Sequence, residues 1–474
     1  MKNLILTFFT ILATTVFAQK NKQDALRSID SKGEQYANIA HQIWEFAEVG
    51  YQEFKSSELL QQTLTQAGFK VEKGVAGIPT AFVASYGSGK PVIAILGEFD
   101  ALPGVSQDAV PEVKPVPGRA AGHACGHHLF GTASSAAAIA VKDWMIANKK
   151  TGTIRLYGTP AEEGGSGKVY MVRDGLFSDV DIVLHWHPGA MNSASFGSSL
   201  ANKSGKFRFR GVASHAAASP ERGRSALDAV EAMDNMVNMM REHVPEDTRI
   251  HYVITRGGEA PNVVPAYAEV YYYVRHPERD QVVSIWDRVV KAAEGAAMGT
   301  ETKMEYEITG GVYNLLSNEA LSKAMDNNLK LVGGYTFTPQ EKEFAEKIQK
   351  TFTNTPPGLE TTSTIVDFGA NSDKGGSTDV GDVSWVVPTA GLSTATWVPG
   401  TAAHSWQAVA AGGMSIGNKG MMMAAKTLAG TAIDLFEQPK IIEDAWKEFN
   451  SRRPKDFKYD ALVGTRKPAL DYRK

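Results

Sequence analysis

The chain has 474 residues, of which 43% are hydrophobic, 21% charged and 9% aromatic, a composition typical of soluble globular proteins rather than disordered or fibrous ones. Such a length exceeds one ordinary core and predicts two domains. The formal net charge of -3 lacks the basic excess of nucleic-acid-binding proteins, so we expect a small-molecule substrate and no nucleic-acid partner.

The N-terminus has the pattern of a secretory signal peptide. Lys2 and Asn3 precede an apolar run over residues 4–16, and small or compact residues follow as far as Ala18. The run is too short to span a membrane, and the polar residues 19–24 argue against the alternative of a buried N-terminal helix. Because no second long apolar run follows, we expect an exported protein, periplasmic or extracellular, with cleavage after about Ala18 and no membrane span.

Cys125 is the single cysteine, so no intrachain disulfide can form. A free thiol is a liability in an oxidising compartment, which indicates a specific role for it. A buried, inert thiol is the alternative.

Helical and strand-like segments alternate along the first 200 residues. Since strands linked by helical crossovers form sheets covered on both faces, the order predicts a largely parallel α/β sheet. The expected helices cover residues 25–50, 56–67, 133–146 and 167–174, and the expected strands cover 81–86, 92–96, 153–157 and 180–186.

The pattern then changes to the order β-α-β-β-α-β, which predicts a ferredoxin-like α+β domain inserted into the first one. Its expected elements cover residues 206–210, 226–241, 249–255, 268–275, 280–294 and 303–308. After residue 318 the α/β character returns, with a strand over 389–397 and long helices over 408–428 and 440–449. We therefore divide the chain into a signal peptide (1–18), a catalytic domain (19–200 and 318–474) and a lid or dimerisation domain (201–317).

A dense group of metal-binding residue types lies in the Gly-rich turn of residues 122–128. It contains Cys125 and the imidazoles of His123, His127 and His128 just before a predicted helix. Thiolate and imidazole are good ligands for zinc and similar ions. His123 and His128 could each belong to a solvated loop instead, because not every imidazole here can face one metal.

Two adjacent carboxylates, Glu162 and Glu163, follow the strand predicted over residues 153–157. Ligands bind at the carboxyl ends of strands in open α/β sheets, and neighbouring side chains on irregular backbone diverge. One carboxylate can therefore bind metal while the other acts as a base. A solvated surface pair is the alternative for this motif alone.

Further histidines follow the next strand and precede the long helix near the C-terminus. His185 and His187 would share one face of a continuing strand, and we expect one of them to be a ligand, with a core histidine as the alternative. His404 lies in a loop of small residues and is a weak candidate alone. In the predicted insert, His215, Asn262 and Arg275 are functional candidates, although loop capping and surface pairing explain the last two equally well.

Together these motifs resemble the M20 family of metal-dependent aminoacylases and carboxypeptidases, in its amidohydrolase branch, over nearly the whole mature chain. Within that branch, residues 97–103 and 131–141 are most similar to the B-type subunits of aminobenzoyl-glutamate hydrolases. The chain departs from the usual pattern in carrying His128, where Asp is common, and in the longer loop over residues 104–121. Both departures bear on substrate shape more than on metal binding.

The resemblance implies a zinc-exopeptidase-like catalytic domain, mostly parallel sheet flanked by helices, that binds two divalent ions, Zn or Mn. Cys125 would bridge the ions, with His127 and Glu163 in one shell and His185 and His404 in the other. Glu162 would be the base, Asp100 would orient a ligand, and His215 would stabilise the oxyanion from the lid, in the same or a partner subunit. Asn262 and Arg275 would hold the carboxylate side of the substrate.

The expected reaction is hydrolysis of an amide with a free carboxylate beside it, such as an aminobenzoyl-glutamate-like or N-acyl-amino-acid substrate, by water that Glu162 deprotonates. A homodimer, or pairing with a second, different subunit, is expected. The competing hypotheses are a hydrolase with Cys125 as nucleophile and His127 or His128 as base, and a non-catalytic metal- or solute-binding protein. Full activity after chelation would support the cysteine hydrolase. Unchanged function in Glu162→Gln would support the binding protein.

Overall fold

The computed structural model describes residues 21–194, 197–370 and 375–473. The predicted signal peptide lies outside these residues. No helix in the described segments is long and apolar enough to cross a membrane.

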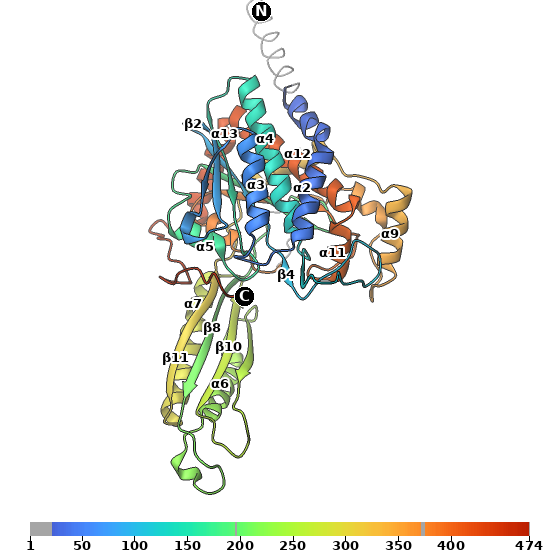
Figure 1. The fold of residues 1–474 in the computed structure, drawn as a ribbon. Coiled ribbons are helices and arrows are strands. Elements are labelled where there is room, and N and C mark those ends of the chain that lie inside the picture. The colour runs from blue at the N-terminus through green and yellow to red at the C-terminus, as the bar shows by residue number, and fades with distance from the viewer. Residues whose placement is uncertain (1–20, 195–196, 371–374, 474) are drawn as a thin grey trace, which may run out of the picture.

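The larger body is built on a six-stranded sheet in the order β1-β2-β6-β3-β7-β12 (Figure 1). β6, β3, β7 and β12 run parallel, whereas β2 pairs antiparallel with β6 and β1 antiparallel with β2. The strands are β1 Lys70–Lys73, β2 Phe82–Ser88, β3 Val92–Gly97, β6 Gly152–Gly158, β7 Ile182–Gly189 and β12 Thr389–Ala395. A separate small sheet pairs β4 Leu102–Pro103 with β5 Ala121–Gly122. The prediction of a mostly parallel sheet is confirmed, with an antiparallel edge added.

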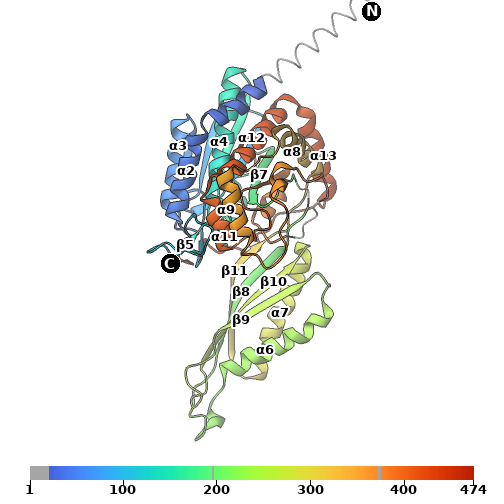
Figure 2. The same cartoon turned by 90° about the vertical axis from the view of Figure 1, so that its right-hand side faces the viewer.

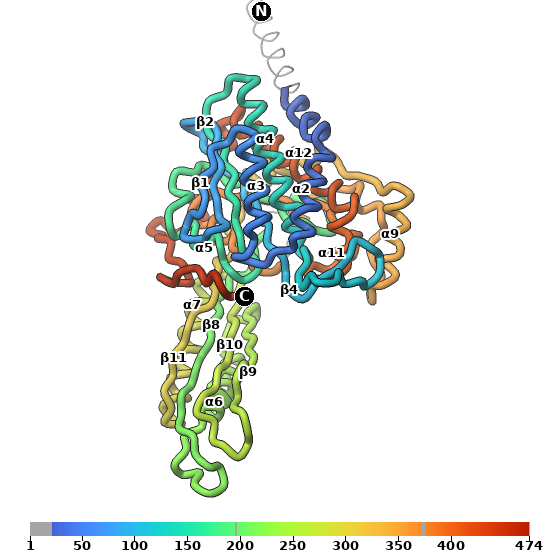
Figure 3. The backbone as a smooth tube through the Cα atoms, viewed as in Figure 1, coloured from blue at the N-terminus to red at the C-terminus, as the bar shows by residue number. Residues whose placement is uncertain are grey.

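Helices cover both faces of this sheet (Figure 3). For that reason β3 is buried at every residue. Ile93 and Ile95 pack in a cluster with residues of α4 and α12, whereas Ala94 and Leu96 point to the opposite face and pack with α5. The helices of the body are α2 Gly33–Phe46, α3 Phe54–Gln66, α4 His127–Ala147, α5 Gly167–Arg173, α8 Glu319–Val332, α9 Pro339–Gln349, α10 Val380–Ser384, α11 Trp406–Gly412, α12 Ser415–Glu437 and α13 Pro439–Arg452.

A second unit extends away from the body, as Figures 1 and 2 both show. Its four strands are antiparallel in the order β11-β8-β10-β9, and its helices pack on one face over their own apolar cluster. The elements are β8 Ala201–Arg210, α6 Ala226–Met240, β9 Arg249–Arg256, β10 Tyr267–His276, α7 Arg279–Gly299 and β11 Lys303–Val312. This order and pairing confirm the ferredoxin-like prediction.

The helix expected over residues 408–428 is wrong as a single element, because the structure divides it into α11 and α12. The break follows Gly412-Gly413, and glycine is unfavourable inside a helix. A side chain at Gly413 would lie 2.8 Å from the ring of Trp44, so the close approach requires glycine there. β1, α8 and α9 were not predicted from the sequence, although Thr338 and Glu341 form a capping box at the start of α9.

Candidate metal centre

Several of the predicted residues meet at one end of the sheet. β3, β6 and β7 run parallel, so their carboxyl ends lie on one edge, where ligands bind in such sheets. Positive φ angles at Ala161 (58°) and His404 (61°) turn the backbone sharply beside two of the side chains. The residues brought together are Glu98 and Asp100 after β3, Cys125 and His127 at the start of α4, Glu162 and Glu163 after β6, His187 on β7, and His404 before α11.

Two groups of potential ligand atoms share the thiol of Cys125. The first comprises Cys125, His127 and His187, and the second Cys125, Glu163 and His404; in each group the ligand atoms all lie within 4.8 Å of one another. Cys125 Sγ is 3.5 Å from His187 Nε2 and 3.6 Å from His404 Nε2. His404 Nε2 in turn is 3.6 Å from Glu163 Oε1. One thiolate between two sets of imidazole and carboxylate ligands matches the chemistry of a two-ion site.

Asp100 fixes the ring of His127. Its Oδ1 accepts a hydrogen bond from His127 Nδ1 at 2.9 Å, and its Oδ2 accepts one from the backbone N–H of Glu163 at 2.9 Å. Burial alone would raise the pKa of Asp100, but the neighbouring His127 and these hydrogen bonds lower it, so the carboxylate stays ionised. His127 therefore presents Nε2 to the cluster, and a metal ligand commonly has such a carboxylate on its other nitrogen.

The site fits bound divalent ions. His127 Nε2 and Glu163 Oε1 are buried and have no hydrogen-bond partner within the described part of the chain. Burial raises the pKa of the Cys125 thiol above its usual range, so a thiolate there requires a nearby cation. Burial also lowers the pKa of His187 to about 4, which keeps its ring neutral, as a metal ligand must be.

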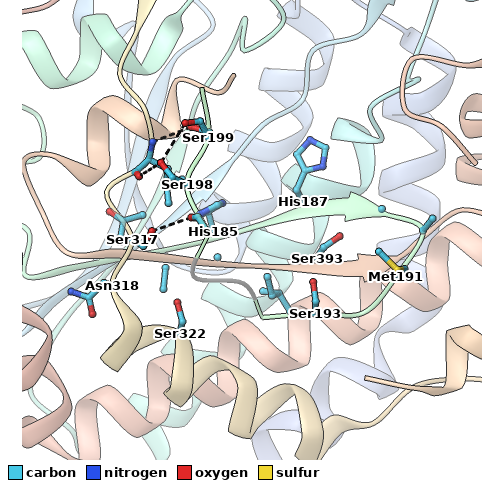
Figure 4. A pocket seen from close by; sticks show the side chains of 18 residues that line it. His185, His187, Met191, Ser193, Ser198, Ser199, Ser317, Asn318, Ser322 and Ser393 are labelled. Atoms are coloured by element: carbon cyan, nitrogen blue, oxygen red, sulfur yellow. Dashed lines mark hydrogen bonds between the residues drawn. The ribbon is translucent and has the colours of Figure 1, made fainter. Parts of the chain in front are cut away.

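His187, and not His185, occupies the place expected for the β7 ligand. Both line a cavity of about 370 Å³ (Figure 4), but His185 belongs to neither group. The ring of His185 packs over β12, where a Cβ at Gly391 would lie 2.3 Å from its Nε2. The two side chains share a face of β7, and only the later one reaches the strand end beside Cys125. The division of ligands between the two ions also differs from the prediction, which placed His127 with Glu163. In the structure His127 groups with His187, and Glu163 groups with His404.

The other two histidines of the Gly-rich turn point away from the cluster. His123 Nε2 is 3.0 Å from the carbonyl of Ile43, and His128 Nε2 is 3.0 Å from the carbonyl of Gly412. Burial lowers the pKa of His123 to about 3, and the ring is neutral. Both histidines are therefore buried packing residues rather than solvated loop residues.

A cavity of about 630 Å³ opens over the cluster, between the body and the second sheet. Cys125, Glu162 and His404 line one wall and Arg275 lines the other, on β10. Arg275 Nε is buried and has no hydrogen-bond partner among the described residues. Residues that were not predicted from the sequence also line the second-sheet side: Asn202, Ser204 and Tyr273.

Glu162 lines this cavity and lies close to Glu98 and His127. Burial, followed by the charges of Glu98 and Glu163, raises the pKa of Glu162 well above its usual range. A carboxylate with a raised pKa holds a proton more readily, which suits a general base. Glu98 was missed in the sequence, although a carboxylate two residues before Asp100 at a strand end is a signal that could have identified it.

His215 and Asn262 do not reach this centre within one chain. Both are exposed on the second unit, where a β-bridge joins His215 to Val263, and neither is among the described residues that line the cavity. The backbone N–H groups of Ala217 and Ala218 donate to His215 Nδ1 at 3.2 and 3.1 Å. In the neutral ring the proton is then on the exposed Nε2, which is free to donate.

The fold and this centre define a two-unit α/β hydrolase with ligands for metal at the ends of its parallel strands. The chain belongs to peptidase family M20/M25/M40, whose family model matches residues 94–380. It is thus an M20-type hydrolase, as its motifs predicted.

Some relatives match most of its length. It is 43% identical to the B-type subunit of the p-aminobenzoyl-glutamate hydrolase of Escherichia coli, over 89% of this chain and 93% of that protein. It is also 29% identical to a mouse Xaa-Arg dipeptidase, over 91% and 92% of the two chains. An aminobenzoyl-glutamate utilization protein from Klebsiella pneumoniae shares the fold, with a TM-score of 0.60 and 18% identity over 87% of this chain and 98% of that one. So does a dinuclear metal-binding M20 peptidase from Bacillus subtilis, with a TM-score of 0.58 and 16% identity over 86% and 99%.

Proposed function

We propose that the protein is an exported, metal-dependent amidohydrolase that cleaves an aminobenzoyl-glutamate-like or N-acyl-amino-acid substrate. The observation that carries the proposal is the pair of ligand groups sharing Cys125, with Glu162 beside them in the same cavity. The 43% identity to one subunit of a p-aminobenzoyl-glutamate hydrolase supports the substrate class. Export rests on the signal-peptide pattern of the first 18 residues.

The ligand set we propose is Cys125 shared between two ions, with His127 and His187 on one and Glu163 and His404 on the other. Divalent ions, zinc or manganese, would supply polarisation of the scissile carbonyl and a lowered pKa for a bound water. Asp100 holds His127 in the tautomer that such binding needs.

Glu162 acts as the general base in this proposal. It takes a proton from the attacking water and returns that proton to the leaving amine. Burial and the neighbouring carboxylates raise the pKa of Glu162, which favours the first of these transfers, uptake of the proton from water. Gln at this position would keep the shape of the side chain but could not accept the proton.

Arg275 is proposed to bind the free carboxylate of the substrate. It faces the ligand groups across the cavity, and its buried Nε has no partner among the described residues, so a carboxylate would satisfy it. Guanidinium and carboxylate make paired, charge-assisted hydrogen bonds. Such a contact would place the adjacent amide beside Glu162.

His215 and Asn262 are proposed to act across a subunit interface, in a homodimer or with a second, different subunit. The exposed Nε2 of His215 can donate to an oxyanion, but it does not reach the cavity of its own chain. Two proteins similar to this chain are named as the A-type subunit of p-aminobenzoyl-glutamate hydrolase or its homologue. These names support a second, different subunit as the partner.

The test is hydrolysis by the purified mature protein of p-aminobenzoyl-glutamate, N-acyl amino acids and Xaa-Arg dipeptides, before and after chelation. We expect cleavage of at least one carboxylate-bearing substrate, loss of that activity on chelation, and recovery with zinc or manganese. Activity that survives complete chelation would refute metal dependence and favour Cys125 as a nucleophile.

A further inference from the structure

A buried chain of charges lies behind the proposed ligands, and no part of the proposed function uses it. Lys168 on α5 is 0% exposed, and its Nζ is 2.7 Å from Glu98 Oε1 and 2.7 Å from Asp379 Oδ1. Asp379 Oδ2 also accepts the backbone N–H of Lys168 at 2.9 Å. Burying a charge is costly unless it is paired, so these contacts hold the three side chains in one arrangement.

The free oxygen of Glu98 faces His127. Glu98 Oε2 lies 3.1 Å from His127 Nε2, and both atoms are buried without a hydrogen-bond partner in the described ranges. Asp100 accepts from His127 Nδ1 and from a backbone N–H, so the proton of neutral His127 is on Nδ1. In the neutral ring two lone pairs face each other in a buried space, and either a bound cation or a proton on Nε2 would satisfy them.

The separation of the two atoms suits shared coordination. Ligand atoms that each lie about 2.0–2.2 Å from a zinc ion are about 3–3.5 Å from each other. Glu98 also forms a compact group with His127 and Glu162, whose ligand atoms lie within 4.8 Å of one another. His127 Nε2 can bind only one ion, so this group and the group of Cys125, His127 and His187 would surround the same ion.

We propose that Glu98 is a further ligand of the ion held by Cys125, His127 and His187, and that Lys168 and Asp379 position its carboxylate. The assignment rests on the two-ion site of the proposed function. With Glu98 the two ions have different numbers of ligands, because Glu98 lies beside His127 and not in the group of Cys125, Glu163 and His404. Lys168 is a positioning residue here, acting through Glu98.

The test is the affinity of the metal-free, full-length mature protein for each of two Zn²⁺ ions, measured by competition with a chromophoric chelator. We expect Glu98→Gln to weaken one of the two ions by about tenfold or more and to leave the other unchanged. We expect Glu98→Asp, which keeps the charge, to restore part of the loss. The double variant Lys168→Met/Asp379→Asn removes the anchor of Glu98 together with the second carboxylate that Lys168 pairs, and it should weaken the same ion.

Glu53→Gln is the matched control. Glu53 is also buried, but it accepts from the backbone of Ala161 and from the Thr80 hydroxyl, contacts that glutamine can keep. The visible spectrum of bound Co²⁺ should change in Glu98→Gln and not in Glu53→Gln, which a merely structural role for Glu98 would not produce.

The outcomes separate this assignment from the proposed function. Two ions bound by Glu98→Gln with wild-type affinities and an unchanged Co²⁺ spectrum would overturn the assignment alone, and would mean that a proton lies between Glu98 and His127. A wild-type protein that binds no metal would overturn the proposed function and this assignment together.

Discussion

Asp100→Asn is a conservative change in shape that we expect to damage the metal centre severely. Both oxygens of Asp100 receive hydrogen bonds, one from His127 Nδ1 and one from the backbone N–H of Glu163, each at 2.9 Å. Asparagine offers one acceptor oxygen, so its amide group would face the second donor. If the oxygen keeps the Glu163 contact, His127 must move its proton to Nε2, the atom that faces the ligand cluster.

Two independent considerations give the size of the effect. A buried donor left without a partner costs about 1–3 kcal/mol. Loss of a carboxylate that orients a metal-binding histidine typically weakens metal binding by about 10–100-fold, or about 1.4–2.8 kcal/mol. The two ranges agree, and the loss should fall on the ion held by His127.

The assay is a competition titration of the metal-free protein with Zn²⁺, alongside the hydrolysis rate of a saturated sample. Glu53→Gln, whose amide can satisfy both partners of Glu53, is the control and should bind as the wild type does. Wild-type affinity for both ions in Asp100→Asn would refute the reasoning that Asp100 sets the tautomer of His127.

Three other changes test the β7 ligand, substrate binding and a buried carboxyl on α10. His187→Ala should lose one of two bound ions in metal analysis, whereas His185→Ala should keep both, and the reverse result would restore His185 as the ligand. Arg275→Met should raise KM for carboxylate-bearing substrates by about 10–100-fold, because a charged hydrogen bond contributes about 1.5–3 kcal/mol to binding, and Arg275→Lys should have an intermediate KM. An unchanged KM in Arg275→Met would show that Arg275 does not bind the substrate. Burial raises the pKa of Asp382 from 3.8 to about 7, so its contribution to stability is complete below about pH 4 and is lost as the pH rises through about 7. Asp382→Asn should flatten the dependence of Tm on pH over that interval, and an unaltered slope would count against this interpretation.

The sequence predicted much of the fold because its strands and helices differ in apolar spacing. The segment around residue 94 is apolar throughout, and the structure buries all of β3 between two helical layers. The order of elements in the second unit was likewise readable from alternation and helical spacing. The division of α11 from α12 was not, because it depends on Trp44, which lies far away in the sequence and packs against Gly413.

The site was predictable in its residue types and less so in its individual members. Cys125, His127, Glu163 and His404 do converge, but strand periodicity alone cannot choose between His185 and His187, which share a face of β7. The choice depends on how far β7 extends relative to the turn that carries Cys125. The roles expected of His215 and Asn262 depend on assembly, which the sequence of one chain does not specify.

Metal content of the purified mature protein, measured together with the hydrolysis rate of p-aminobenzoyl-glutamate in the wild type and in Glu162→Gln, decides whether this is a metal-dependent amidohydrolase. We expect near two divalent ions per chain in both proteins. Activity should be lost on chelation and lowered by about 10²–10⁴-fold in the variant, because only the base is removed. A metal-free wild type that remains active would refute metal dependence and assign the chemistry to Cys125.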